Sequence, residues 1–121
     1  MILLDTNALI WLLTEHKRIA KLPKREHRYF VSPVSLLELR FLNELGRIRF
    51  RGGDLDLSHD PRIVVDDPST VQLFEHAWSI NWTRDPFDRL IVAHAILRGW
   101  RLATSDANIV SHLGPRATLE L

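Results

Sequence analysis

Short apolar runs alternate along this chain with segments of helical periodicity, and this alternation restricts the fold more than any other feature. We predict strands at 2–4, 29–32, 62–65, 101–104 and, at the end of the chain, 117–121. Short continuous apolar runs are typical of strands buried on both faces. Strands that alternate with helices predict an α/β domain with a mainly parallel central sheet and helices on both of its faces.

The segments between these runs carry the start and stop signals of helices. We predict helices at 7–13, 34–45, 68–78, 85–98 and 107–113. Pro33 suits the first turn of the second helix, and Gly46 and Gly99 are good C-terminal signals. The segment 17–28 is expected to hold a short helix or loop, and 46–61 reads as a loop or irregular crossover.

Composition restricts the class of protein. A chain of 121 residues with no cysteine is expected to form one domain, 1–121, without disulfides or thiolate metal sites. No apolar stretch is long enough to span a bilayer and no signal peptide is recognisable, so we expect a soluble cytoplasmic protein. The net charge is +1, but the charged residues are unevenly distributed: the segment 17–28 is basic and the segment 54–67 is acidic. Both could simply be solvated faces.

Acidic and hydroxyl side chains follow the predicted strands, where open parallel sheets bind their ligands. The residues are Asp5, Thr6 and Asn7 after the first strand, Glu38 on the helix after the second, Asp85 and Asp88 in the first turn of the long helix, and Thr104 and Asp106 after the fourth strand. Each has a simpler explanation as a helix cap or a partner of the helix dipole. Taken singly, they therefore do not establish a site.

Two of the acids share helix faces with apolar residues. At helical spacing, Glu38 lies in line with Val34, Phe41 and Leu45, and Asp88 with Ile91, Val92 and Ala95. A buried carboxylate without a cation partner costs several kcal/mol or becomes protonated. Two acids on apolar faces and two at strand ends therefore predict a cluster.

A cluster of carboxylates without histidine or cysteine is a hard oxygen site. Such a site suits Mg²⁺ or Mn²⁺, one or two ions, and not zinc. Paired divalent ions can activate water and stabilise the leaving oxygen in phosphodiester hydrolysis. Arg84 and Arg89 lie next to these acids in the sequence and could hold a nucleic-acid backbone. Arg89 could equally form an intrahelical ion pair with Asp88.

Four stretches together resemble PIN-domain nucleases, above all the VapC-type toxins of bacterial toxin–antitoxin pairs: MILLDTNALIWLL, SLLEL, RDPFDRLIVAHAILRG and LATSD. The resemblance implies a PIN-like three-layer sandwich and a metal-dependent endoribonuclease that acts on RNA. By motif, it puts catalytic metal ligands at Asp5, Glu38, Asp88 and Asp106. The residues that it implies as supports for these ligands are Thr6, Asn7, Thr104 and Asp85. It also implies a small DNA-binding antitoxin as partner and a homodimer.

The chain departs from the family at RFRGGDLDLSHDP, where similar toxins often carry a further helix. RNA selection and antitoxin fit are therefore the parts of the resemblance that transfer least. All four acids are present, so nothing in the sequence indicates an inactive enzyme.

The same residues argue against two other classes of protein and leave two open. A phosphorelay receiver needs paired acids after the first strand and a lysine near the C-terminus, and this chain has neither. A haloacid-dehalogenase-like phosphatase needs DxD, but the third position here is Asn7. A DNA-directed or structure-specific nuclease, and a non-catalytic RNA-binding regulatory protein, both stay open. His94 is expected to be a packed residue, and Trp78 and Trp82 could make partner contacts.

Overall fold

The computed structural model describes residues 1–26, 28–50 and 56–121. Its elements, in chain order, are β1 (Ile2–Leu4), α1 (Thr6–Leu13), the 3₁₀ helix η1 (Lys17–Lys21), β2 (Tyr29–Val31), α2 (Pro33–Glu44), β3 (Ile63–Val65), α3 (Thr70–Trp78), α4 (Pro86–Arg98), β4 (Arg101–Thr104), α5 (Ala107–Leu113) and β5 (Thr118–Glu120). The predicted elements are confirmed to within about two residues, an ordinary uncertainty at element ends. Parts of the predicted 17–28, 46–61 and 54–67 segments lie outside the described residues.

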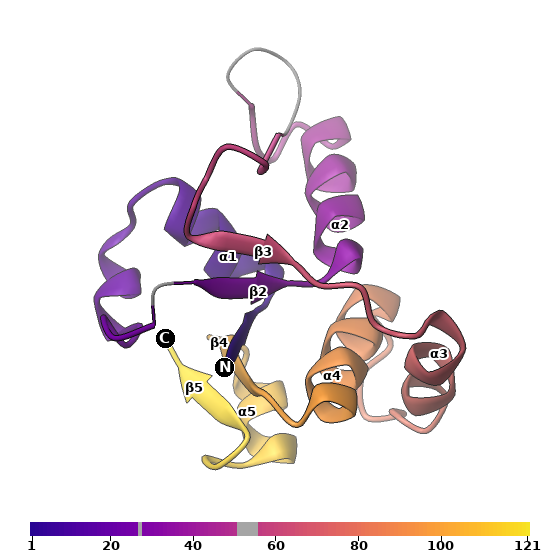
Figure 1. The fold of residues 1–121 in the computed structure, drawn as a ribbon. Coiled ribbons are helices and arrows are strands. Elements are labelled where there is room, and N and C mark those ends of the chain that lie inside the picture. Colours follow the sequence, from indigo (N-terminus) through magenta and orange to yellow (C-terminus); the bar gives the residue numbers. More distant parts are fainter. Residues whose placement is uncertain (27, 51–55) are drawn as a thin grey trace.

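The strands form one sheet in the order β3-β2-β1-β4-β5, and every neighbouring pair is parallel (Figure 1). The predicted α/β class is therefore confirmed. β1 is the central strand: Leu4 is in register with Val31 of β2 on one side and with Ala103 of β4 on the other. The chain adds β2 and β3 on one side of β1 and then crosses to add β4 and β5 on the other.

This reversal of strand order between β1 and β4 matters for the site. A crevice opens at the carboxyl ends of the strands where successive connections leave in opposite directions, and ligands of open α/β sheets bind there. The residues that directly follow β1 and β4 are therefore at the position where this topology favours a ligand.

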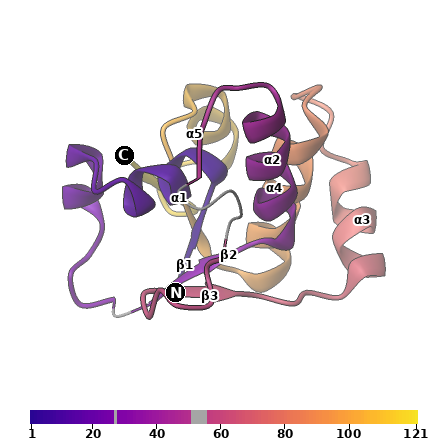
Figure 2. The same ribbon diagram turned by 90° about the horizontal axis from the view of Figure 1, so that it is seen from above.

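The sheet has an apolar cluster on each face, and the side-chain alternation of β1 shows how they are separated. Ile2 and Leu4 point into a cluster shared with α1, whereas Leu3 points into one shared with α3, α4 and α5. Helices thus cover both faces. α3 lies at the outer margin of the molecule, beyond α4, in both views (Figures 1 and 2).

Acidic and hydroxyl side chains begin the helices. Asp5, Ser32, Ser69, Asp85 and Asp106 each accept a backbone N–H at the start of α1 to α5 in turn, and satisfy donors that have no partner within the helix. Gly99 ends α4 in the left-handed region at φ 68°, where glycine has no Cβ penalty. Within the described ranges, no helix has both the length and the apolar character that a membrane crossing requires.

The sequence interpretation of α2 needs a correction. We expected Glu38 to lie in a buried stripe with Phe41 and Leu45, but these two side chains are 48% and 54% exposed. The helix instead buries Ser35 and Leu39, which are one turn apart and fully inaccessible. The end of this face that carries Phe41 and Leu45 is thus at the surface, whereas Glu38 itself is partly buried. The corresponding face of Asp88 on α4 is buried, as predicted.

Candidate active site

Asp5 lies at the carboxyl end of the central strand and combines two local roles. Its backbone N–H donates to the carbonyl of Ala103 at 3.0 Å, so the first residue after β1 is tied to β4. Its carboxylate Oδ1 accepts the N–H of Ala8 at 2.7 Å and caps α1. The side chain is only 7% exposed. The cap uses only a small part of a carboxylate's acceptor capacity, so oxygen lone pairs are left for further ligands.

Thr104 and Asp106 are held beside Asp5 from the end of β4. The fully buried hydroxyl of Thr104 is hydrogen-bonded to the carboxylate of Asp5 and accepts the backbone N–H of Asp106 at 3.0 Å. Asp106 in turn accepts the N–H groups of Asn108 and Ile109 at 2.8 and 3.2 Å, which begins α5. One hydroxyl therefore positions both strand-end acids.

Glu38 reaches the same region from α2 and is contacted by Thr6. The Thr6 hydroxyl, 5% exposed, is hydrogen-bonded to Oε1 of Glu38. Partial burial of the Glu38 carboxyl raises its pKa, while the Thr6 hydrogen bond acts in the opposite direction and the charge of Asp85 adds to the rise. Thr6, the residue next to Asp5, thus holds Glu38, which is thirty-three positions after Asp5 in the chain.

Asp88 occupies the first turn of α4, behind the capping residue Asp85. Burial, followed by the negative charges of Asp85, Glu38, Asp106 and Asp5, raises the pKa of Asp88 to about 7. Asp85 itself is exposed and accepts the N–H groups of Phe87 and Asp88 at 2.8 and 3.4 Å. The structure therefore gives Asp85 a capping role and also makes it an electrostatic neighbour of Asp88.

These acids influence one another although they come from four separate elements. Burial raises the pKa of Asp5 to about 6, with further contributions from the charges of Glu38 and Asp106 and opposing hydrogen bonds from Thr104 and Ala8. Like charges that are close together disfavour ionisation of each group. The fold has thus gathered the four acids that the sequence proposed as ligands into one electrostatically coupled group.

The other sequence candidates are less closely involved. Asn7 and Arg84 are exposed. Among the described residues Arg89 forms no ion pair with Asp88, because its Nε donates to the carbonyl of Thr83 at 2.7 Å. His94 is packed, as predicted: it is fully buried and hydrogen-bonded to Asp66 at 2.7 Å. The sequence interpretation missed Ser35, a buried hydroxyl 3.2 Å from Thr6, because serine in a helix has no distinctive pattern.

The donor set of this group fits a hard divalent cation. All its side-chain ligand atoms are carboxylate or hydroxyl oxygens, and a cation would offset the burial and the mutual repulsion that raise the pKa values of Asp5 and Asp88. In the described parts of the chain, no three acidic or histidine side chains are close enough to enclose an ion by themselves. Mg²⁺ commonly keeps several waters and uses only one or two protein carboxylates, so an ion held here would need water to complete its coordination.

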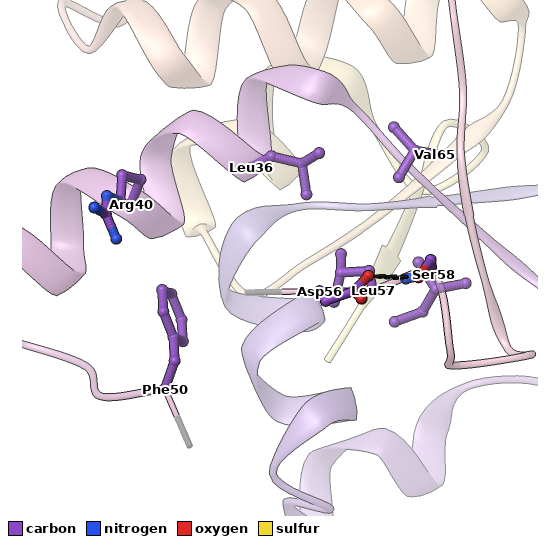
Figure 3. A pocket seen from close by; sticks show the side chains of 8 residues that line it. Leu36, Arg40, Phe50, Asp56, Leu57, Ser58 and Val65 are labelled. Atoms are coloured by element: carbon purple, nitrogen blue, oxygen red, sulfur yellow. Dashed lines mark hydrogen bonds between the residues drawn. The ribbon is translucent and has the colours of Figure 1, made fainter. Parts of the chain in front are cut away.

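A cavity of about 480 Å³ lies away from these acids, between α2 and the edge strand β3 (Figure 3). Leu36 and Arg40 of α2 and Val65 of β3 are among its lining residues. None of the candidate ligands lines it. Mostly apolar walls and the absence of the site acids make it a poor candidate for phosphodiester chemistry, so the acid group is the better candidate site.

The chain is similar to known proteins over nearly its whole length. The family model described as "PIN domain" matches residues 2–112. Ribonuclease VapC22 from Mycobacterium tuberculosis is 35% identical over 123 aligned positions, which cover 95% of this chain and 94% of that protein. The solved structure "Toxin-antitoxin complex from Klebsiella pneumoniae" superposes with a TM-score of 0.62 at 18% identity and covers 100% of both chains. At that identity, the structural match supports the fold alone.

Proposed function

The chain belongs to the PIN-domain family, and from this premise we propose that it is a ribonuclease of the VapC type, the toxin of a toxin–antitoxin pair. The relative that supports this is named a ribonuclease and aligns over nearly the full length of both proteins. The observation that carries the proposal is the convergence of Asp5, Glu38, Asp88 and Asp106 at the point where the strand order reverses. We further propose that residues 1–121 act as one domain.

Each site residue has a distinct role in this proposal. The four acids hold one or two Mg²⁺ or Mn²⁺ ions, which, when bound, supply Lewis-acid activation of water and stabilisation of the leaving oxygen. Thr104 fixes Asp5 and Asp106, and Thr6 fixes Glu38. Asp85 holds the first turn of α4, which carries Asp88. Asn7, Arg84 and the guanidinium of Arg89 are assigned to the rim, where they contact the RNA backbone.

The Asp88 position gives the sharpest test of this function. Purified protein is incubated with single-stranded RNA in Mg²⁺ or Mn²⁺, with EDTA, and as the Asp88→Asn and Asp106→Asn variants. We expect cleavage only by the wild-type protein with metal. Glu75→Gln, which removes an exposed acid of α3, is the matched control and should cleave normally. Cleavage that persists in EDTA and in both site variants would overturn the metal mechanism.

A DNA arm in the same assay separates the nearest alternatives. Single-stranded and hairpin DNA of the same sequence are tested beside the RNA, because a protein distinguishes the two through the 2′-hydroxyl. Selective RNA cleavage supports the ribonuclease. Equal cleavage of DNA would indicate a general or structure-specific nuclease, and binding without any cleavage would indicate a regulatory RNA-binding protein.

Partners form a further part of the proposal. We assign the chain a small DNA-binding antitoxin and place it in the cytoplasm, where its RNA substrate is found. We also propose a homodimer, supported by an unusually apolar outer surface on α3: Val71, Phe74 and Trp78 are 68%, 57% and 89% exposed. They recur at intervals of three and four residues and therefore form one face of the helix. An exposed aromatic patch of this kind is typical of a protein interface.

A further inference from the structure

Behind Glu38 lies a hydroxyl that the motif-based assignment does not include. Ser35 is on α2, one turn before Glu38, and its side chain is completely inaccessible to solvent. Its Oγ lies 3.2 Å from Oγ1 of Thr6, and the Thr6 hydroxyl contacts Oε1 of Glu38. Two buried hydroxyls and one carboxylate thus form a continuous line from the interior toward the site.

The number of hydroxyl protons determines which group donates in each of these hydrogen bonds. Thr6 has a single hydroxyl proton but two oxygen neighbours, the Glu38 carboxylate and the Ser35 hydroxyl. A hydrogen bond to an ionised acceptor is roughly twice as strong as one to a neutral acceptor, so the proton of Thr6 goes to Glu38. The Ser35 proton is then directed at the remaining lone pair of Thr6. The order of donation is Ser35 to Thr6 to Glu38.

The usual role of a helical serine does not account for Ser35. Serine hydroxyls inside helices commonly donate to the carbonyl four residues earlier, which here is that of Val31. That carbonyl accepts the N–H of Asp66 at 2.9 Å, and within the described residues the Ser35 hydroxyl has Thr6 as its one hydrogen-bond partner. Ser32, equally buried and directly before the same helix, has a different role: its Oγ accepts the N–H of Val34 and caps the helix.

We propose that Ser35 is a positioning residue that fixes the hydroxyl of Thr6 and, through it, the orientation of the Glu38 carboxylate in the metal site. A hydroxyl rotates freely unless its lone pairs and its proton are engaged. Ser35 engages one lone pair of Thr6, so the Thr6 proton keeps its aim at Oε1 and the second oxygen of Glu38 is left for a cation. This inference rests on the proposed function, since it assigns Glu38 to a divalent ion.

Direct metal binding tests the inference without relying on catalysis. Mn²⁺ affinity is measured by calorimetry on the full chain, for wild type, Ser35→Ala and the control Ser32→Ala. Loss of a partner behind a metal ligand typically weakens metal affinity by about 10-fold or more, and we expect Ser35→Ala to do so. Ser32→Ala should lower thermal stability through loss of a cap, yet bind Mn²⁺ as wild type does.

A double-substitution cycle shows whether Ser35 acts through Thr6. In the Thr6→Val background the relay is already broken, so adding Ser35→Ala should change Mn²⁺ affinity no further, and the two effects should be non-additive. Fully additive losses would overturn the relay. Ser35→Cys, with a weak thiol donor, has the same expected direction and serves if Ser35→Ala unfolds.

The outcomes separate this inference from the proposed function. If wild type binds Mn²⁺ and Ser35→Ala binds it equally well, the positioning role is wrong and the nuclease assignment is unaffected. If wild type binds no Mn²⁺ and cleaves no RNA, both proposals fall together. RNA cleavage by the same variants should follow the metal affinities, with activity of Ser35→Ala recovered as the Mn²⁺ concentration is raised.

Discussion

The backbone N–H of Asp106 donates to Oγ1 of Thr104 at 3.0 Å, and the same fully buried hydroxyl is hydrogen-bonded to Asp5. With one acceptor site used by Asp106, the proton of Thr104 is directed at the Asp5 carboxylate. A single threonine at the end of β4 thus joins the two acids that follow the two central strands. Its position ties the geometry of the candidate site to the stability of the fold.

Replacement of Thr104 by valine should therefore reduce stability. Thr104→Val keeps the volume but removes both hydrogen bonds, and we expect a loss of about 1–3 kcal/mol in the free energy of unfolding. It should also raise the pKa of Asp5 further, because the lost hydrogen bond favours the ionised carboxylate. Urea unfolding measures the loss. Thr14→Val, at an exposed hydroxyl, is the control and should cost less than about 0.5 kcal/mol.

Asp88→Asn is expected to stabilise the metal-free protein in a pH-dependent way. The pKa of Asp88 is raised from 3.8 to about 7, so the folded state binds this proton more tightly than the unfolded state between those values. Stability is therefore lost as pH rises through this window, and the full cost is present above it. The variant should gain most at about pH 8 and little at about pH 4. An equal gain at both pH values would contradict the electrostatic cause.

His94 should give the opposite pH dependence. Burial lowers the pKa of His94 below 6.5, and its Nδ1 is buried with no hydrogen-bond partner in the described residues, while Nε2 binds Asp66. The unfolded state therefore takes up the proton first, and stability is lost as pH falls below 6.5. His94→Gln can still donate to Asp66 but does not titrate.

Thermal unfolding of wild type and His94→Gln between about pH 7.5 and pH 5.5 tests this prediction. The melting temperature of wild type should fall more than that of the variant over this range. His76→Gln, an exposed histidine on α3, is the control. Asp5 and Asp88 change the stability in the opposite direction over this pH range. The melting temperatures of wild type and variant are therefore compared at each pH, and their difference gives the contribution of His94.

Divalent ions should stabilise the wild-type protein and have little effect on the site variants. An ion that binds only the folded state adds about 2.7 kcal/mol at a concentration 100 times its Kd. Mg²⁺ or Mn²⁺ should thus raise the melting temperature of wild type, and EDTA should reverse the rise. For Asp88→Asn we expect a much smaller shift. Equal shifts in both proteins would indicate that the ions bind elsewhere.

The apolar face of α3 makes the homodimer testable. Trp78→Ser removes a side chain that is 89% exposed, so it should leave the fold of the subunit intact and weaken subunit association. Light scattering after size-exclusion chromatography measures the mass. Leu37→Ser, at a 63% exposed position of α2, is the control and should keep the wild-type mass. A monomeric wild-type protein, or a dimer unaffected by Trp78→Ser, would contradict the proposal.

Local chemistry was sufficient to predict the elements and their order. Pro33, Gly99 and the acids that precede helices act through bonds within a few residues, so their effect is visible in the sequence alone. The same holds for the parallel sheet, because short apolar runs separated by helices have few other ways to be buried. The four acids were named as ligands from the resemblance to PIN-domain nucleases, and their roles stay predictions.

Contacts between distant segments could be decided only by the tertiary structure. Helical periodicity shows which residues share a face of a helix, but not which face packs against the sheet. For this reason the prediction that Phe41 is buried was wrong. The strand order brings Asp5 beside Thr104, and the approach of α2 to α1 places Ser35 against Thr6. The sequence thus determined the elements and the acids that follow them. Packing decided which hydroxyl holds each acid, because hydrogen bonds between remote segments depend on how those segments are arranged in space.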